Sequence, residues 1–156
     1  MPKVVKSSLK SSERGGNMLY GKYKFSINEK GRLFVPAKMR DSLGEKFILS
    51  KSPTDDCLVM YTQEEWARIQ ERLDRAPTAT KAVRRRLFGN AVEMELDKQG
   101  RMIVPQEHRE YAKLSGDVII LGVGSSAEVW NAERYAEYEA QEDNEQMEQL
   151  LKELDL

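Results

Sequence analysis

Two stretches of the sequence share one pattern: residues 28–40 read "NEKGRLFVPAKMR" and residues 97–109 read "DKQGRMIVPQEHR". Gly, Arg, Val, Pro and a second Arg occupy the same places in both stretches, at an offset of 69 residues. A whole pattern that recurs at a fixed spacing indicates two copies of one structural unit. The fold is decided by this repeat, and the organisation of the rest of the chain follows from it.

Each copy opens with a predicted β-hairpin. The residues before each turn, 21–27 and 90–96, alternate apolar and polar side chains, which is typical of a half-buried strand. Gly31 and Gly100 then stand where a tight turn needs a positive φ, which glycine adopts at little cost. The turn itself therefore accounts for the repeated glycine.

The return strands, residues 32–35 and 101–104, are apolar at every position after the arginine, so we expect both of their faces to be covered. Pro36 and Pro105 end these strands and suit the start of a short helix. Two more apolar runs and a further helix complete each copy. Because a unit of roughly 60 residues buries little core alone, we expect a mainly β fold with short α-helices in which two copies share one core.

The chain divides into five parts. We expect a flexible basic extension at residues 1–17 and a first copy at residues 18–76. A linker helix at residues 77–88, which begins at Pro77 and Thr78, leads to a second copy at residues 89–140. Residues 141–156 form an acidic tail. Apolar side chains recur at helical spacing in the tail, which predicts a short amphipathic helix, with disorder as the alternative. These side chains are Met147, Leu150, Leu151 and Leu154.

The composition argues against several classes of protein. No apolar run reaches the roughly 18 residues of a membrane span, and the N-terminal segment lacks the apolar centre of a secretory signal, so we expect a cytoplasmic protein. Cys57 and His108 are the single cysteine and histidine, too few for a disulfide framework or a Cys/His metal site. Without a phosphate-binding glycine loop or a nucleophile in register with His108, we expect no enzyme, cofactor or small-molecule substrate. His108 replaces Met39 of the first copy, which favours a packing or helix-surface role.

Charge is distributed unevenly along the chain. Residues 1–40 hold ten Lys and Arg against two acidic residues, whereas residues 126–156 hold ten Asp and Glu against two basic ones. A basic head is typical of contact with a polyanion, although two solvated surfaces would give the same pattern.

The doubled Asp-x-x-Gly-Arg turn, followed by apolar-Val-Pro-x-x-x-Arg, resembles the MraZ family of bacterial regulators of the division and cell-wall gene cluster. The likeness is carried by "MLYGKYKFSINEKGRLFVPAKMR" and "RRRLFGNAVEMELDKQGRMIVPQEHR", and it covers residues 18 to about 140. The resemblance implies a tandem swapped-hairpin β-barrel of the AbrB type and ring-shaped homo-oligomers, commonly octamers. It also implies binding of double-stranded DNA at G-rich direct repeats in the promoter of the family's own gene cluster, hence an association with the nucleoid.

The family's Asp-x-x-x-Arg pair maps onto Asp97 and Arg101 in the second copy. In the first copy Asn28 stands in place of the Asp, with Arg32 in register. Asn keeps the turn-forming side chain but lacks the charge that would hold the arginine, so we do not expect an ion pair to Arg32 there.

The functional hypothesis centres on Arg32, whose guanidinium could bond a guanine edge or clamp a phosphate; the alternative is a turn arginine paired with a carboxylate. Residues 20–40 hold six Lys and Arg against one acid, and residues 89–109 hold three against four. We therefore expect the first copy to dominate phosphate contact and Arg101 to be partly structural or at a subunit seam. The candidate DNA contacts are Arg32, Lys30, Lys22, Lys24, Arg101, Arg40, Arg85 and Arg86, and the hairpin motif is formed by Asn28, Gly31, Asp97, Gly100 and Arg109.

Some of these residues have a second interpretation. Arg40 and Arg109 are more commonly salt-bridge residues in a helical context, and Arg85 and Arg86 belong to a charge run that could simply be solvated. For the whole chain, the alternative function is a protein-binding module, antitoxin-like or a scaffold, that acts through its acidic tail.

Overall fold

The computed structural model describes residues 18–156, so the expected extension at residues 1–17 lies outside the described part of the chain. In chain order the elements are β1 (Lys22–Ile27), β2 (Arg32–Phe34), α2 (Ala37–Leu43), β3 (Lys46–Lys51), β4 (Leu58–Tyr61), α3 (Gln63–Arg75), α4 (Lys81–Phe88), β5 (Val92–Glu95), β6 (Arg101–Ile103), α5 (Gln106–Ala112), β7 (Gly116–Gly122), β8 (Ser126–Asn131), α6 (Ala132–Ala140) and α7 (Asn144–Glu153). The two copies repeat one order of elements, as the sequence predicts.

The strands exchange partners between the two copies. The larger sheet has the order β1-β7-β8-β4-β3-β5, and β2 and β6 form a separate antiparallel ribbon. The first strand of each copy pairs with the third strand of the other, β1 with β7 and β5 with β3. Each hairpin is therefore built into the sheet of the opposite copy, which confirms the predicted tandem swapped-hairpin fold.

One hydrophobic core serves both copies. Leu33 and Val35 of the first copy and Met102 and Val104 of the second are fully buried in the same cluster, together with residues of the central strands such as Phe47. This arrangement follows from the exchange of hairpins, because neither copy keeps its own β-ribbon.

The prediction that both faces of the return strands are covered is wrong. Phe34 is 42% exposed and Ile103 is 59% exposed, while Leu33 and Met102 beside them are fully buried. Successive side chains of a strand point to opposite faces, and the β2–β6 ribbon covers the core with one face only. The outward face is open, and it exposes the apolar side chains of Phe34 and Ile103.

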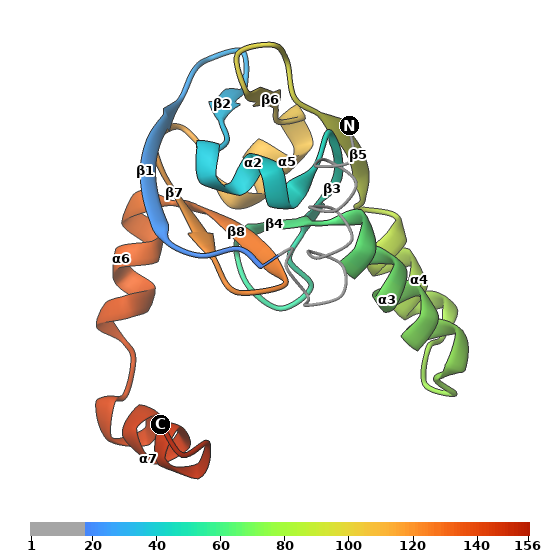
Figure 1. Ribbon diagram of the computed structural model, residues 1–156, viewed down its shortest axis with the longest axis vertical. Helices are drawn as coiled ribbons and strands as arrows, with labels where there is room; N and C mark the ends of the chain where they lie inside the picture. Colours follow the sequence, from blue (N-terminus) through green and yellow to red (C-terminus); the bar gives the residue numbers. More distant parts are fainter. Residues whose placement is uncertain (1–17) are drawn as a thin grey trace, which may run out of the picture.

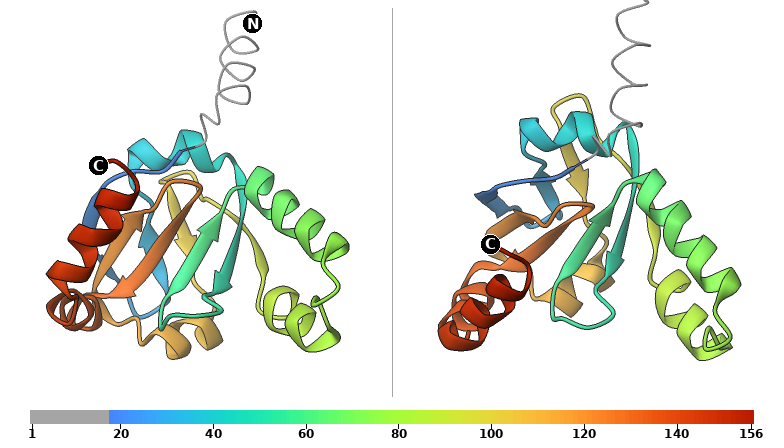
Figure 2. Two further views of the ribbon diagram at one scale, coloured as in Figure 1. Left: turned by 90° about the horizontal axis from the view of Figure 1, so that it is seen from below. Right: turned by 60° about the horizontal axis from the view of Figure 1, so that its bottom comes forward.

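Two helical appendages extend from the sheet on opposite sides, α3 with α4 and α6 with α7 (Figure 1). Figure 2 shows the same arrangement from below: α3 and α4 (green) lie on one side of the strands, and α6 and α7 (red) lie on the other. Thr62 caps α3 by accepting from Glu65 N at 3.0 Å, and Asn131 caps α6 by accepting from Arg134 N at 3.0 Å. Thr and Asn are favoured N-cap residues because their side-chain oxygens accept from a free backbone N–H of the first turn.

The linker helix α4 begins later than predicted. Its first residue is Lys81, and its N-cap is Thr80, whose hydroxyl accepts from Val83 N at 3.4 Å. Pro77 and Thr78 lie in the turn that precedes this cap. No helix within residues 18–156 is long and apolar enough to cross a membrane.

Candidate nucleic-acid interface

The two hairpin turns have the same backbone geometry. Asn28 Oδ1 accepts from the backbone N–H groups two and four residues further on, at 3.0 and 2.9 Å. Asp97 Oδ1 accepts from the equivalent pair of N–H groups, both at 2.9 Å. Gly31 and Gly100 each have a φ of 82°, in the left-handed region that favours glycine. Asn and Asp thus perform the same turn-forming role, since both offer a carbonyl-type oxygen.

The turns differ in what happens to the arginine that follows. Arg101 Nε lies 3.0 Å from Asp97 Oδ2, and its guanidinium carbon lies 5.8 Å from the centre of the Phe34 ring. Within residues 18–156 the Arg32 side chain forms no hydrogen bond or ion pair. Arg101 is thus held by its own turn, whereas the Arg32 guanidinium has no partner among the described residues.

The pKa of the Asp97 carboxyl is lowered by its surroundings. The backbone N–H of Arg101 donates to it, with further contributions from the Arg101 guanidinium and the backbone of Gln99. All of these contacts favour the ionised carboxylate. The second turn therefore keeps its negative charge at neutral pH, which the amide of Asn28 cannot supply.

The repeated second arginine of each copy supports the turn of the other copy. Arg109 Nε donates to Val104 O at 3.0 Å, and its Nη1 donates to Glu29 O at 3.1 Å in the first turn. A Cβ added at Gly31 would lie 2.7 Å from Val104 O and 2.8 Å from Arg109 Nε. The first turn is therefore packed directly on a half-buried guanidinium from the second copy.

Arg40 occupies the equivalent position under the second turn. Its Nε donates to Val35 O at 2.9 Å, and a Cβ added at Gly100 would overlap its guanidinium. Val35 N also donates to Gly100 O at 3.0 Å, just as Val104 N donates to Gly31 O at 2.8 Å. In the described part of the chain neither Arg40 nor Arg109 forms an ion pair; both bond carbonyl oxygens instead.

The outward side of the β2–β6 ribbon joins the two turns in one surface. Arg32 is opposite Ile103 and Phe34 is opposite Arg101 in the register, so two arginines and two exposed apolar side chains alternate diagonally. We call these four residues the ribbon face. Figure 1 shows both turns above the ribbon, at the same end of the molecule. Sequence reasoning missed Phe34 and Ile103 here, because every residue after the arginine is apolar in both return strands, which hides the alternation of a strand with one open face.

The candidate lysines are spread along β1. Lys30 is exposed in the first turn, beside Arg32. Lys24 lies 3.5 Å from Asp117 and Lys22 lies 3.7 Å from Glu139. A strand rises about 3.3 Å per residue, so Lys22 is roughly 17 Å from the turn. The structure brings Lys30 together with Arg32 and places Lys22 and Lys24 in exposed ion pairs elsewhere.

Arg85 and Arg86 are exposed on α4, which lies away from the two turns (Figure 1). The arginine run is therefore separate from the ribbon face. Any contact that these residues make with DNA requires a second point of contact.

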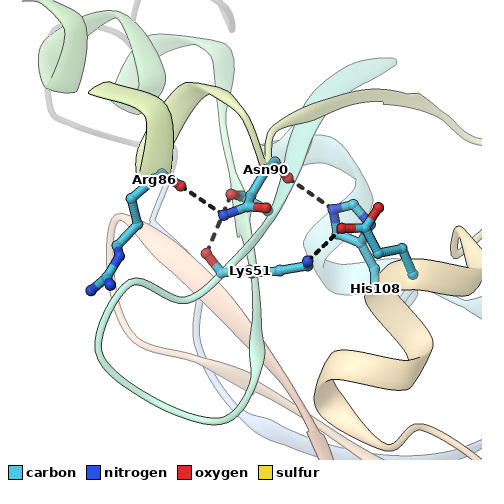
Figure 3. A network of polar contacts seen from close by, with 6 residues as sticks. Lys51, Arg86, Asn90 and His108 are labelled. Carbon is cyan, nitrogen blue, oxygen red and sulfur yellow. Dashed lines mark hydrogen bonds and ion pairs between the residues drawn. The ribbon is translucent and has the colours of Figure 1, made fainter. Parts of the chain in front are cut away.

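His108 has a packing role. It is buried, and its Nε2 lies 2.8 Å from Asn90 O, while Asn90 Nδ2 donates to Arg86 O at 2.8 Å. Lys51 Nζ donates to Glu107 Oε1 at 2.7 Å beside this chain of contacts (Figure 3). The network ties α5 to the segment that joins α4 to β5.

The thiol of Cys57, the one cysteine of the chain, is buried. Burial raises the pKa of the Cys57 thiol, so the group is neutral at physiological pH. Among residues 18–156, no three His, Cys, Asp or Glu side chains gather as they would around a metal ion.

Comparison with known proteins identifies relatives of the whole repeat. The model of the MraZ protein family, described as antitoxin-like, matches the chain twice, at residues 18–88 and 87–155. The transcriptional regulator MraZ of Acetivibrio thermocellus is 45% identical over 128 residues, which cover 80% of this chain and 89% of the relative. The proteins of the same name from Heliobacterium modesticaldum and Caldicellulosiruptor saccharolyticus are 45% and 46% identical, over 78% and 76% of this chain and 86% and 84% of their own lengths.

Proposed function

The chain belongs to the MraZ family, and on that premise we propose that it is a sequence-specific DNA-binding transcriptional regulator. Its relatives are named as transcriptional regulators, which sets the chain among regulators and not among enzymes. The proposed target is a set of G-rich direct repeats in the promoter of the division and cell-wall gene cluster, including the protein's own gene. The protein acts in the cytoplasm, on the nucleoid, as a ring-shaped homo-oligomer, an octamer in this proposal.

The observation that carries this proposal is the unpaired guanidinium of Arg32 on the ribbon face. A two-stranded β-ribbon fits the major groove of B-DNA, and an arginine there can bond the O6 and N7 atoms of guanine together. Because the turn is braced by Arg109 from below, Arg32 projects from a rigid base. Lys30 stands beside it in the exposed turn and supplies a phosphate contact.

The other candidates have weaker claims. The bond of Arg101 Nε to Asp97 offsets part of its charge and leaves only the two Nη groups free to bond a base, so its contribution is smaller. Lys22 and Lys24 must leave their carboxylate partners to reach a phosphate. We assign Arg40 a supporting role under the second turn, and Arg85 and Arg86 a peripheral one.

Ring assembly gives a reason for repeated boxes in the DNA. A ring presents one ribbon face per subunit, and each bound subunit raises the effective concentration of its neighbour at the next box. Individually weak contacts then add to a tight complex.

A binding experiment with matched duplexes tests the proposal. Fluorescence anisotropy would compare a duplex that carries two G-rich repeats with one of the same composition and scrambled order, at several salt concentrations. We expect the repeat duplex to bind at least about a thousandfold more tightly, as specific regulators do. Equal affinity for both duplexes at every salt concentration would exclude sequence-specific binding.

A further inference from the structure

The two helical appendages have little buried surface of their own. We call residues 63–88, with α3 and α4, the basic hairpin, and residues 132–156, with α6 and α7, the acidic arm. No residue of α4, α6 or α7 is buried, and Glu65 is the one buried residue of α3. Helices of 8 to 13 residues are marginal in water unless an apolar face is packed. Trp66 of α3 packs on Tyr61 and Phe88, and Tyr135 and Tyr138 of α6 pack on Trp130. Among the described residues α7 has no aromatic contact of this kind.

The acidic arm presents an uncovered apolar stripe. Met147, Leu150, Leu151 and Leu154 are 41%, 48%, 39% and 68% exposed. At about 100° per residue these four side chains share one side of α7. A stripe of this kind on a helix that stands away from the body is suited to pack on another helical surface.

Acidic side chains border this stripe. At the same angular spacing Glu148 lies next to one edge and Glu153 next to the other. Neither forms an ion pair within residues 18–156. The arm as a whole holds nine Asp and Glu against two basic residues, so its apolar stripe is framed by negative charge.

The basic hairpin also exposes apolar side chains, but basic side chains border them. Val83 is 39% exposed, and Ile69, Leu73 and Leu87 are only partly buried. Arg72 and Arg86 border these apolar residues on α3 and α4, and neither forms an ion pair in the described part of the chain. The hairpin holds seven Lys and Arg against four acidic residues.

We propose that the acidic arm of one chain docks on the basic hairpin of a second copy of the chain. The arm and the hairpin of one chain lie on opposite sides of the sheet, so the arm cannot fold back onto its own hairpin (Figures 1 and 2). Opposite charges frame the two apolar surfaces, which fixes the pairing and disfavours arm on arm or hairpin on hairpin.

This docking is head to tail, because the two surfaces that meet are different. Every chain offers one of each, so the contact continues until the array closes as a ring or grows as a filament. The inference deepens the proposed function, and rests on it, by naming the surfaces that hold the ring together.

Charge reversal with complementation tests the pairing. One variant carries Arg72→Glu and Arg86→Glu, and the other carries Glu148→Lys and Glu153→Lys. Each variant alone now opposes like charges across the contact, and we expect the subunit dissociation constant to rise about tenfold or more. In size-exclusion chromatography with light scattering, each should elute as a monomer at a concentration at which the unaltered chain is assembled.

Mixing the two variants should restore assembly. The lysines of one arm then face the glutamates of the other variant's hairpin, and the remaining arm and hairpin are both unaltered. A control with Lys38→Glu and Lys46→Glu makes the same change in net charge as the Arg72→Glu and Arg86→Glu variant, on exposed residues of the body, and should leave the assembled mass unchanged. Circular dichroism of each variant checks that the fold persists.

Leu150→Asp tests the apolar stripe separately and should also give a monomer. Its hairpin is unaltered, so the Arg72→Glu and Arg86→Glu variant, whose arm is intact, should form only a dimer with it and no larger assembly. The proposal is overturned if both reversal variants and Leu150→Asp keep the unaltered mass. It is equally overturned if the reversal variants are monomers whose mixture does not assemble, which would make the arm a site for a different protein. Anisotropy with the repeat duplex is read in parallel: assembly as expected without DNA binding by any chain would defeat the proposed function and leave the docking intact.

Discussion

The two hairpin turns show how one atom can divide a repeated motif into two roles. In both turns a side-chain oxygen, from Asn28 or Asp97, accepts hydrogen bonds from the backbone N–H groups two and four residues further on. In both turns the glycine has the same φ. The second oxygen of Asp97 binds Arg101, and Asn28 has an amide nitrogen in its place. The two turns therefore share their backbone hydrogen bonds, but only Arg101 is bonded by the side chain of its own turn.

The parts that stay alike in the two copies are those that build the fold. Arg40 and Arg109 each bond a carbonyl oxygen of their own copy and pack under the turn of the other. The parts that differ, Asn28 against Asp97 and the charge around each turn, change what the surface can bind. The residues that differ between the copies are therefore the ones on which the proposed DNA contact rests.

The largest expected effect concerns the turn that rests on the second copy's arginine. Gly31→Ala should lower the free energy of unfolding by about 3 kcal/mol, because a left-handed φ costs an L-residue about 1 to 2 kcal/mol and overpacking against Val104 O and Arg109 adds a similar amount. Gly116→Ala is the matched control, since its φ is 70° and its added Cβ would meet no atom within 4 Å. Chemical denaturation of both variants gives the comparison, and equal losses would show that Arg109 does not press on the turn.

An exchange of the two turn residues should shift the roles of the arginines. Asn28→Asp gives Arg32 the partner that Arg101 has, and we expect specific DNA binding to weaken about two- to fivefold, the range of an exposed ion pair. Asp97→Asn should free Arg101 and leave binding unchanged or slightly tighter. Anisotropy with the repeat duplex measures both, and stronger binding by Asn28→Asp would contradict the account.

The same pair of variants makes a prediction about pH. The folded-state pKa of Asp97 is lowered, so its contribution to stability is complete above the ordinary aspartate pKa of about 3.9 and is lost as the pH falls through the lowered value. Asp97→Asn should remove this part of the acid-side loss. Thermal unfolding at a series of pH values is the measurement, and an unaltered pH profile in the variant would show that the turn does not stabilise the ionised Asp97 carboxylate in solution.

The smallest effect is expected for single lysines. Lys30→Ala should reduce the slope of log affinity against log salt by about one, because one phosphate contact is lost. Lys22→Ala should change that slope less, since Lys22 already pairs with Glu139. Equal changes in the salt slope for Lys30→Ala and Lys22→Ala would indicate that Lys22 contacts a phosphate as Lys30 does.

Much of this arrangement could be predicted from the sequence because the relevant interactions are local. Alternating side chains predict the strands, glycine predicts the turns, and the replacement of Asp by Asn in the first copy predicts an arginine without a local partner. The resemblance to the MraZ family was confirmed as well, because it rests on a long motif that occurs twice.

The rest depends on contacts between residues far apart in the chain. The position of Arg109 under the first turn follows from the exchange of hairpins, and no spacing within one copy reveals it. The ion pairs of Lys22 and Lys24 use acids from the second copy for the same reason. The sequence did not predict that one side of the β2–β6 ribbon is open, because strands of three residues are too short for an alternation of buried and exposed side chains to be recognised.

The most direct test of the central claim compares Arg32→Ala with Arg101→Ala on the repeat duplex. Arg32→Ala should weaken specific binding by about 1 to 3 kcal/mol, the value of a bidentate arginine–guanine contact, and should relax the preference for guanine. Arg101→Ala should cost distinctly less and leave that preference in place. Equal losses from the two variants, or a larger loss from Arg101→Ala, would contradict the division of roles between the two turns.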